Sequence, residues 1–473
     1  MTGRSGRTAV VVGSGPNGLT AAALLTRRGY RVDVLEAADS YGGGTRTAEL
    51  TLPGFRHDVC AAVHPLGIAS PVFRDLRLGD HGVEWLQPPF PLAHPLDEGP
   101  AVLLHRSLAE TADGLGADGE RWNRLVGPLV RSFDAIVDHV LGPPVRLPAR
   151  PLPVARFGLS GVQSARRVAG RFLYAPARAL LAGCAAHSIA PLQRPATAAI
   201  GLLLAAAAHH RGWPVARGGS QAIADALAAI VIGQGGSIRT GHRVASPDDL
   251  PAAEVYLFDV APRTLAQIAG DRFPPRYRRR LERWRHGPGS FKIDWALAGP
   301  IPWRDPAVAG AGTVHLGGTF EEIAAAEAAV VRGEHPDRPF VLLSQPGVVD
   351  PDRAPPGRHV AWGYCHVPAG STRDMTSAIE AQVERFAPGF GELVLQRHTL
   401  TATDLEAGNA NYVGGDIGGG AFRLRSLLFR PRLRRPYSTP DPDIFLVSAS
   451  TPPGAGVHGM CGFHGVRAID RRR

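Results

Sequence analysis

The sequence is poor in cysteine, and its few cysteines are far apart. Four cysteines, at 60, 184, 365 and 461, form no CxxC pair in 473 residues. This spacing excludes a disulfide framework and a zinc ribbon, and it suits a reducing compartment. Long apolar runs are also missing, because the longest, at 198–208, falls well short of the roughly 20 residues that cross a bilayer. We expect that run to form a buried helix.

The residues before the first glycine motif lack the apolar segment and the cleavage site of a secretory signal. This absence favours a cytoplasmic protein. The net charge of +10 could indicate nucleic-acid binding, but the arginines are spread along the chain without interleaved aromatic residues. One dense basic cluster occurs, at 276–286, and we expect it to form a solvated helix face. The sequence therefore predicts no nucleic-acid partner.

Lysine is almost absent. The 52 basic residues include a single lysine, Lys292. Lysine is compact and its pKa shifts readily on burial, so it can serve where arginine cannot. The alternative is that chance left one lysine in an arginine-biased chain. Residues 286–303 alternate polar and apolar side chains after a Gly-Pro-Gly turn, a pattern that predicts a strand around Lys292.

The first 37 residues carry the strongest motif. Residues 8–12 and 31–36 are rich in valine, typical of buried parallel strands, and a helix-forming stretch lies between them. Glycines in GxGxxG spacing permit a tight turn, let the backbone approach a pyrophosphate and allow close helix–strand packing. Glu36 ends the second strand, where a carboxylate can accept hydrogen bonds from a ribose. The motif and the helix N-terminus predict cofactor contacts by Gly13, Gly15, Pro16, Asn17 and Gly18.

The segment after Glu36 distinguishes FAD from NAD as the cofactor. It contains Gly42, Gly43, Gly44 and Arg46. It resembles the glycine-rich, arginine-ended segment of FAD enzymes in the amine oxidase and phytoene desaturase superfamily, where the arginine lies close to the flavin and the pyrophosphate. The resemblance implies that Gly43, Gly44 and Arg46 bind FAD. The alternative is a flexible surface turn.

Two central segments also resemble this superfamily. Residues 213–244 resemble the stretch that returns to the FAD domain, which places Val244 where the backbone contacts adenine. Residues 286–303 resemble the substrate-domain strand of amine oxidases, in which a lysine holds a water against flavin N5. This implies a catalytic role for Lys292. The alternative is a Lys292–Asp294 pair on a solvated strand face.

The segment 443–465 resembles the last flavin motif of the superfamily. Residues 443–450 predict a strand, and a helix is expected to start near Gly459 after a glycine-rich loop. In the superfamily such a helix N-terminus stabilises a reduced flavin. The resemblance implies cofactor contacts by Gly456, Gly459 and Met460 and a place for His458 beside the flavin ring. His458 and His464 lack the H-x3-H spacing of a metal site, so no metal is expected.

Together these motifs resemble phytoene desaturase-like FAD oxidoreductases, and more narrowly the branch named pyridine nucleotide-disulfide oxidoreductase domain-containing protein 2-like. The resemblance implies an α/β fold with a Rossmann-type FAD-binding domain assembled from residues 1–74, 213–262 and 431–473. An α+β substrate-binding domain, residues 75–212 and 263–430, is inserted into it.

The expected function is an FAD-dependent oxidoreductase that desaturates or saturates carbon–carbon bonds of an apolar substrate, such as a polyene or isoprenoid. The alternatives are a flavin amine oxidase and a non-redox isomerase or FAD-binding protein. We expect an apolar tunnel with residues 196–208 in one wall, and contact with membranes at their surface at most. The sequence leaves the oligomeric state open.

Overall fold

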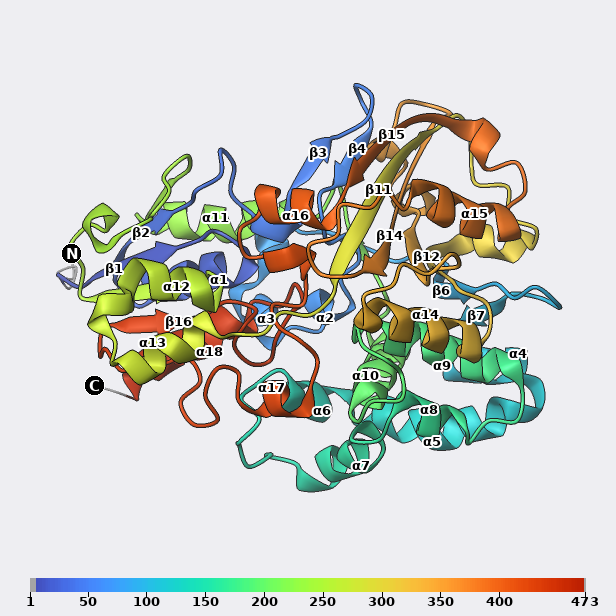
Figure 1. Cartoon of the computed structure of the whole chain (residues 1–473), viewed down its shortest axis with the longest axis horizontal. Helices are drawn as coiled ribbons and strands as arrows, with labels where there is room; N and C mark the ends of the chain where they lie inside the picture. Colours follow the sequence, from blue (N-terminus) through green and yellow to red (C-terminus); the bar gives the residue numbers. More distant parts are fainter. Residues whose placement is uncertain (1–5, 472–473) are drawn as a thin grey trace.

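Two large β-sheets and a layer of helices make up the molecule (Figure 1). The structure is a computed structural model that describes residues 6–471, without the side chain of Leu428. Within residues 6–471 every helix is too short or too polar to serve as a membrane span.

The first sheet has five parallel strands in the order β16-β10-β1-β2-β9. Its strands are β1 (Thr8–Val12), β2 (Arg31–Leu35), β9 (Ser237–Arg239), β10 (Val255–Phe258) and β16 (Ile444–Leu446). They come from three stretches that are far apart in the sequence. Alternate apolar side chains of β1 enter different cores, since Val11 packs in one and Val10 in another. Burial on both faces explains why these strands are continuous apolar runs.

Helices cover both faces of this parallel sheet. On one face, α1 packs against α11 and α18. On the other face, the buried apolar side chains of α12 and α13 pack in one core with Val10 and Phe258. The bounds of these helices are α1 Pro16–Arg27, α11 Gln221–Gly233, α12 Pro262–Ala269, α13 Pro275–Glu282 and α18 Met460–Asp470. The basic cluster expected to be one helix face is α13, which buries only Tyr277 and Leu281 and exposes its arginines.

The second sheet has seven strands in the order β15-β11-β14-β13-β12-β6-β7. Its strands are β6 (Phe90–His94), β7 (Val102–Leu104), β11 (Gly289–Leu297), β12 (Ala311–Leu316), β13 (Val341–Ser344), β14 (His359–Val367) and β15 (Val394–Leu400). Phe291, Ile293 and Trp295 of β11 pack with the apolar side chains of α15 (Thr376–Phe386). Because side chains alternate along a strand, Lys292 and Asp294 lie on the opposite face.

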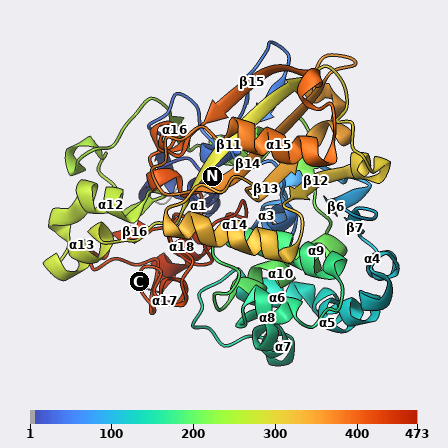
Figure 2. The ribbon, with the colours of Figure 1, turned by 45° about the vertical axis from the view of Figure 1, so that its right-hand side comes forward.

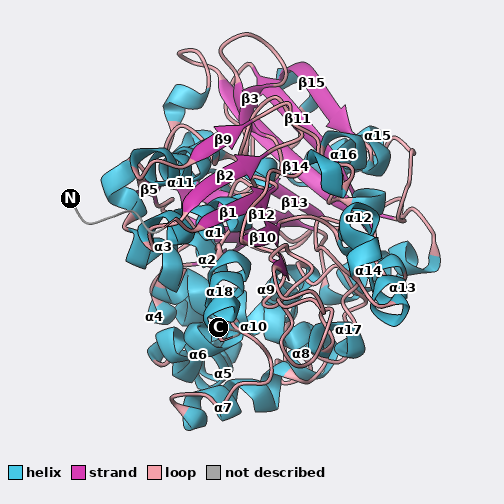
Figure 3. Ribbon diagram, turned by 90° about the vertical axis from the view of Figure 1, so that its left-hand side faces the viewer, coloured by secondary structure: helices cyan, strands magenta, loops and turns pink. Residues whose placement is uncertain are grey.

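A helical layer lies beneath both sheets (Figures 2 and 3). It consists of α5 (Gly119–Arg131), α6 (Phe133–Val140), α7 (Pro151–Gly161), α8 (Ala165–Ala169), α9 (Ala175–Ala186) and α10 (Thr197–His210). The central helix, α10, packs against α5, α7 and α9. It is buried almost throughout, as expected for the apolar run 198–208. The expected α/β class with a Rossmann-type parallel sheet is therefore confirmed.

Candidate cofactor and substrate cavity

The turn between β1 and α1 is as tight as the GxGxxG spacing predicts. Gly13 has a φ of +94°, and a Cβ there would lie 2.6 Å from the backbone oxygen of Asp259. A Cβ at Gly18 would lie 2.1 Å from the oxygen of Gly13. Side chains at either position would force the strand, the turn and the helix apart. Gly18 therefore allows α1 to pack closely against the turn, and it is itself buried behind the turn.

Glu36 organises the end of β2. Its carboxylate accepts a hydrogen bond of 2.9 Å from the backbone N–H of Ser14, and another of 2.9 Å from the N–H of Ala38. Its backbone oxygen accepts from the N–H of His242 at 2.7 Å. This last bond brings the segment that contains Val244 next to Glu36, although about two hundred residues separate them in the sequence. The Ser14 hydroxyl also donates to the carboxylate.

The second glycine segment packs on the first. The N–H of Gly42 donates to the oxygen of Ser14 at 3.0 Å, and a Cβ at Gly43 would lie 3.0 Å from the Cα of Gly15. Arg46 donates through Nε to the oxygen of Gly43 at 3.0 Å. These contacts rule out the alternative of a flexible surface turn, because the segment is bonded to the GxGxxG turn.

These segments line one cavity of about 550 Å³. Most of the residues predicted to bind the cofactor lie in its wall, namely Gly13, Gly15, Pro16, Asn17, Glu36, Gly43, Gly44, Arg46, Val244 and Gly456. The side-chain oxygen of Asn17 is buried and has no partner among the described residues. A close backbone approach, a carboxylate at the end of β2 and a free polar atom at a helix N-terminus suit a dinucleotide, with Glu36 at a ribose and the turn at the pyrophosphate.

Another part of the wall comes from the helical layer and the second sheet, and it is mostly apolar, although His187 and Tyr364 also line it. Its apolar side chains are Ile189, Ile200, Leu203, Leu204, Trp213, Leu342 and Trp362. Ile200, Leu203 and Leu204 belong to α10, so the run 196–208 forms one wall as expected. Among the described residues that line the cavity, the only carboxylates are Glu36 and Asp259, both at the glycine turn.

Lys292 lies behind the cavity wall. It is buried on β11 and forms an ion pair with the buried Asp294. Its Nζ lies 5.7 Å from the ring centroid of Trp362, which does line the cavity. The expected pair with Asp294 exists, but on a buried strand face and not on a solvated one.

His458, Gly459 and Met460 also lie behind the wall, whereas their neighbours Ala455, Gly456 and Val457 line the cavity. The His458 ring is fully buried, and its Nδ1 accepts a hydrogen bond of 3.1 Å from the N–H of Met460. Burial lowers the pKa of His458 to about 4. The ring therefore caps the start of α18. Gly459 has a φ of +66°, and a Cβ there would lie 2.4 Å from Oγ1 of Thr20 on α1.

Two residues beside the glycine turn were not singled out from the sequence. Asp259 follows β10 and accepts a hydrogen bond of 2.8 Å from the N–H of Gly18. Asn411 bonds to the backbone on both sides of Val260, because it accepts from the N–H of Ala261 at 2.8 Å and donates to the oxygen of Asp259 at 2.9 Å. Asn411 lies in a segment, residues 409–420, that contains five glycines, and this composition is the one sequence signal for it. Nothing in the sequence pairs Asp259 with Gly18.

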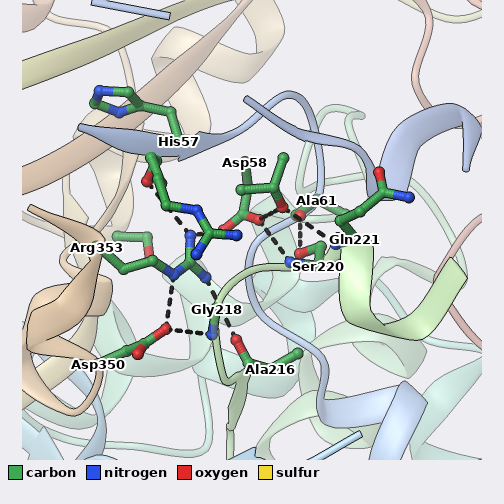
Figure 4. Close-up of polar contacts among 12 residues, drawn as sticks. His57, Asp58, Ala61, Ala216, Gly218, Ser220, Gln221, Asp350 and Arg353 are labelled. Carbon is green, nitrogen blue, oxygen red and sulfur yellow. Dashed lines mark hydrogen bonds and ion pairs between the residues drawn. The ribbon is translucent and has the colours of Figure 1, made fainter. Parts of the chain in front are cut away.

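A buried arginine links Asp350 to Asp58 and to the backbone of residues 216–220 (Figure 4). Arg353 donates to Asp350 at 2.7 Å and to Asp58 at 3.1 Å. Asp58 also accepts from the N–H of Ser220 at 2.7 Å, and Asp350 accepts from the N–H of Gly218 at 2.7 Å. Burial lowers the pKa of Arg353, but the two carboxylates outweigh it and hold the pKa above its ordinary value. The network holds the segment that leads into α11 against residues 58–61.

Within residues 6–471 no three or more His, Cys, Asp or Glu side chains are arranged to hold a metal ion.

Comparison with known proteins supports this description. The profile of the NAD(P)-binding Rossmann-like domain matches residues 11–77. One component of limonene dehydrogenase from Castellaniella defragrans is 32% identical over 120 residues, 24% of this chain and 22% of that protein. Pyridine nucleotide-disulfide oxidoreductase domain-containing protein 2 from Mus musculus is 39% identical over 102 residues, 21% of this chain and 17% of that protein. The matches thus span about a fifth of these relatives.

Solved structures match over nearly the full chain. An oxidoreductase from Methanosarcina mazei aligns with a TM-score of 0.65 at 16% identity, covering 98% of this chain and 100% of that one. A variant of putrescine oxidase also aligns with a TM-score of 0.65 at 16% identity, covering 99% and 100%. Residues 11–77 therefore match a Rossmann-like dinucleotide-binding domain, and the chain as a whole has the fold of the Methanosarcina mazei oxidoreductase and of putrescine oxidase.

Proposed function

We propose that the protein is an FAD-dependent oxidoreductase that transfers hydride between flavin and a carbon–carbon unit of an apolar, uncharged substrate. The observation that carries this proposal is the cavity, which joins a dinucleotide-type glycine turn to an apolar wall without carboxylates. FAD, when bound, supplies the hydride chemistry. Residues of the chain bind it, orient the substrate against it and exclude water.

The binding roles follow from the geometry. Glu36 accepts hydrogen bonds from a ribose, and Gly13 and Gly15 leave room for the pyrophosphate. Arg46 carries a positive charge on the same wall. Ile200, Leu203 and Leu204 hold an apolar molecule by removing its surface from water. The cofactor and the substrate can thus share one cavity.

The relatives point to two kinds of substrate. One is named limonene dehydrogenase and another putrescine oxidase, the first acting on a hydrocarbon and the second on a diamine. An amine is a cation at neutral pH, and burying it without a carboxylate is costly. The apolar wall supplies none, because Glu36 and Asp259 lie at the glycine turn. This favours the hydrocarbon-like substrate over the amine.

Lys292 and His458 were expected to be catalytic, and that role remains a prediction. Because both lie behind the wall, we propose that they act through their neighbours. Lys292 faces the ring of Trp362, and His458 orders the loop that carries Gly456 and Val457. Both are thus positioning residues in this proposal.

Anaerobic reduction of the purified protein tests the proposal. We expect a yellow protein whose pigment is released by acid as FAD and is bleached by limonene but not by putrescine. Bleaching by putrescine alone would establish an amine oxidase. Conversion of an apolar compound without net bleaching would establish a non-redox isomerase, and an apoprotein that binds NAD but refuses FAD would overturn the cofactor assignment.

A further inference from the structure

A group of buried histidines lies behind the apolar wall, and one of them reaches the cavity. The histidine cluster consists of His94, His187, His315 and His366. The rings of His187 and His315 have centroids 5.1 Å apart, and His94 lies 6.4 Å from His315. His94, His315 and His366 are buried, whereas His187 is half-buried and lines the cavity beside Trp213.

Three members of the cluster, His94, His187 and His315, are neutral. Burial lowers the pKa of His187 to about 3 and that of His94 to about 4. Burial also lowers the pKa of His315 well below its ordinary value. Each of these rings therefore has one N–H and one lone pair at physiological pH, and only the place of the proton distinguishes its two nitrogens.

Two members show where the cluster places its protons. His94 must donate through Nε2, because its partner at 2.7 Å is the carbonyl of Gly318. His366 donates through Nδ1 to Glu327 at 2.7 Å. The other nitrogen of each ring is buried and has no partner among the described residues. The His94 ring thus uses its N–H and leaves its lone pair unpaired.

We assign the proton of His315 in the same way as that of His94. Its Nδ1 is buried without a partner in the described chain, and its Nε2 lies 3.0 Å from Nε2 of His187. One of these two Nε2 atoms must carry a proton and the other a lone pair. If Nδ1 of His315 is the unpaired lone pair, its Nε2–H donates to His187. The proton of His187 is then on Nδ1, the nitrogen that does not face His315.

We propose that Nδ1–H of His187 donates a hydrogen bond to a neutral oxygen, a carbonyl or hydroxyl, of an otherwise apolar substrate. This inference rests on the proposed function and narrows its substrate class. A protonated amine has no lone pair to offer to an N–H donor, so it gains nothing at this position. His315 is a positioning residue, because its Nε2–H holds His187 in the donor form.

Calorimetric binding of carvone and limonene to the holoenzyme tests this assignment. The two molecules share a carbon skeleton, and only carvone has a carbonyl. We expect carvone to bind roughly tenfold more tightly, the contribution of one net hydrogen bond. His187→Phe should lose that preference while limonene binding stays unchanged. His315→Phe should reduce it, and His315→Gln, which keeps a donor, should retain it.

His335→Phe is the control, because His335 bonds to Ser371 and does not line the cavity. Limonene binding without a preference for carvone overturns this inference and leaves the proposed function intact. An equal loss of both ligands in His187→Phe shows that His187 only packs, and also overturns the inference. Failure of both probes to bind the wild-type protein overturns the inference and the proposed function together.

A second observation concerns the outer surface. The exposed large apolar side chains of the described chain gather mainly in residues 143–174, which we call the 143–174 face. They are Val145, Leu147, Leu152, Leu159, Val162, Leu173 and Tyr174, with exposed fractions from 55% at Tyr174 to 94% at Leu147. Leu152 and Leu159 are 78% and 73% exposed on α7. Leu152 and Leu159 are seven residues apart and so project from the same side of α7, where exposed apolar side chains can contact a partner surface.

Every charged side chain within residues 143–174 is an arginine. The 143–174 face contains six arginines, at 146, 150, 156, 166, 167 and 171. No aspartate or glutamate occurs between Asp138 and Asp225. Apolar side chains mixed with arginines and without acids complement a negatively charged lipid surface.

The position of α7 suits such a contact. It lies at the outer edge of the helical layer, away from both sheets (Figures 1 and 3). On its inner side α7 packs against α10, where a Cβ at Gly161 would lie 3.2 Å from the Cβ of Ala199. Because α10 forms one wall of the apolar cavity, this single helix separates α7 and the 143–174 face from the cavity.

We infer that the 143–174 face binds the surface of an anionic membrane, with α7 in the headgroup layer. Flotation with vesicles tests this. The full-length protein should float with equimolar phosphatidylcholine and phosphatidylglycerol, and much less with phosphatidylcholine alone. Leu152→Asp/Leu159→Asp should reduce flotation at least about tenfold.

Leu395→Asp is the matched control, because Leu395 is 43% exposed on β15 in the second sheet. Its flotation should equal that of the wild type. Absence of flotation with either vesicle, or equal flotation of the α7 variant, overturns the inference. A wild-type dimer that the α7 variant dissociates, without any lipid binding, would overturn it too and assign the face to a second copy of the chain.

Discussion

The ammonium group of Lys292 is ion-paired with the carboxylate of Asp294 on a strand face that is almost closed to solvent. Their exposed fractions are 3% and 0%. His398 and His57 approach the same carboxylate at 3.4 and 3.6 Å. Burial raises the pKa of Asp294, but Lys292 and the two histidines outweigh it and hold the pKa below its ordinary value. The single lysine of the chain thus compensates a buried charge.

Lys292→Met should therefore destabilise the fold. Removal of one partner of a buried pair leaves an uncompensated charge and costs about 3–5 kcal/mol, whereas a surface pair would cost little. The free energy of unfolding in urea measures this. Lys292→Met/Asp294→Leu removes both charges and should recover most of the loss. A single variant as stable as the wild type would contradict the importance of the pair.

Glu36→Gln should weaken FAD binding. A ribose hydroxyl that donates to a carboxylate would then donate to a neutral amide oxygen, and we expect a loss of roughly 10- to 150-fold in affinity. Titration of the apoprotein with FAD measures it. Glu49→Gln, on the exposed strand β3 (Thr47–Glu49), is the control and should bind FAD as the wild type does. Equal affinity of both variants would remove Glu36 from the ribose site.

Asp259 should make stability depend on pH. Burial raises the pKa of the Asp259 carboxyl to about 7, and the negative charge of Glu36 also raises it. The hydrogen bond from the N–H of Gly18 lowers this pKa, but by less. In the unfolded chain the Asp259 carboxyl has an ordinary pKa near 4. Protonated Asp259 therefore contributes its full share to the stability of the fold below about pH 4, and this share is lost as the pH rises to about 7.

Asp259→Asn removes this titration. The variant should gain on the order of 3 kcal/mol relative to the wild type between pH 5 and pH 8. Thermal melting at the two pH values measures the difference. If the variant and the wild type differ in stability by the same amount at both pH values, Asp259 is ionised in the folded protein from pH 5 to pH 8.

Arg353→Met should destabilise the protein and release the segment 216–221. Two buried carboxylates, Asp58 and Asp350, lose their common partner, at a cost of about 3–5 kcal/mol. Arg217→Met is the control, because its pair with Glu84 is exposed. Melting temperature and FAD content should fall in the first variant and stay unchanged in the second. Equal behaviour would contradict the bridging role of Arg353.

The parts of the site that can be predicted from the sequence are those formed by residues close together in the chain. Gly13, Gly15 and Glu36 are recognisable because strand, turn and helix follow one another within about thirty residues. The contacts that complete the site depend on distant segments. Asp259 bonds to Gly18 across 241 positions, and His187 meets His315 across 128. No local pattern encodes such pairs. His458 shows the same limit, since its loop was predicted correctly but its ring points into the helix start.

Leu203 offers the most direct test of the shared cavity. It lines the wall on α10, far along the chain from Glu36 and Arg46, which bind the cofactor in our proposal. Leu203→Trp adds volume where an apolar substrate would lie, so anaerobic flavin reduction by limonene should slow at least about tenfold, the equivalent of 1.4 kcal/mol. Its FAD content should stay at the wild-type level. Leu203→Met conserves the volume and should behave as the wild type. If Leu203→Trp keeps its FAD and is reduced as fast as the wild type, the apolar wall is not the substrate site. If Leu203→Trp instead loses FAD, this wall belongs to the cofactor site.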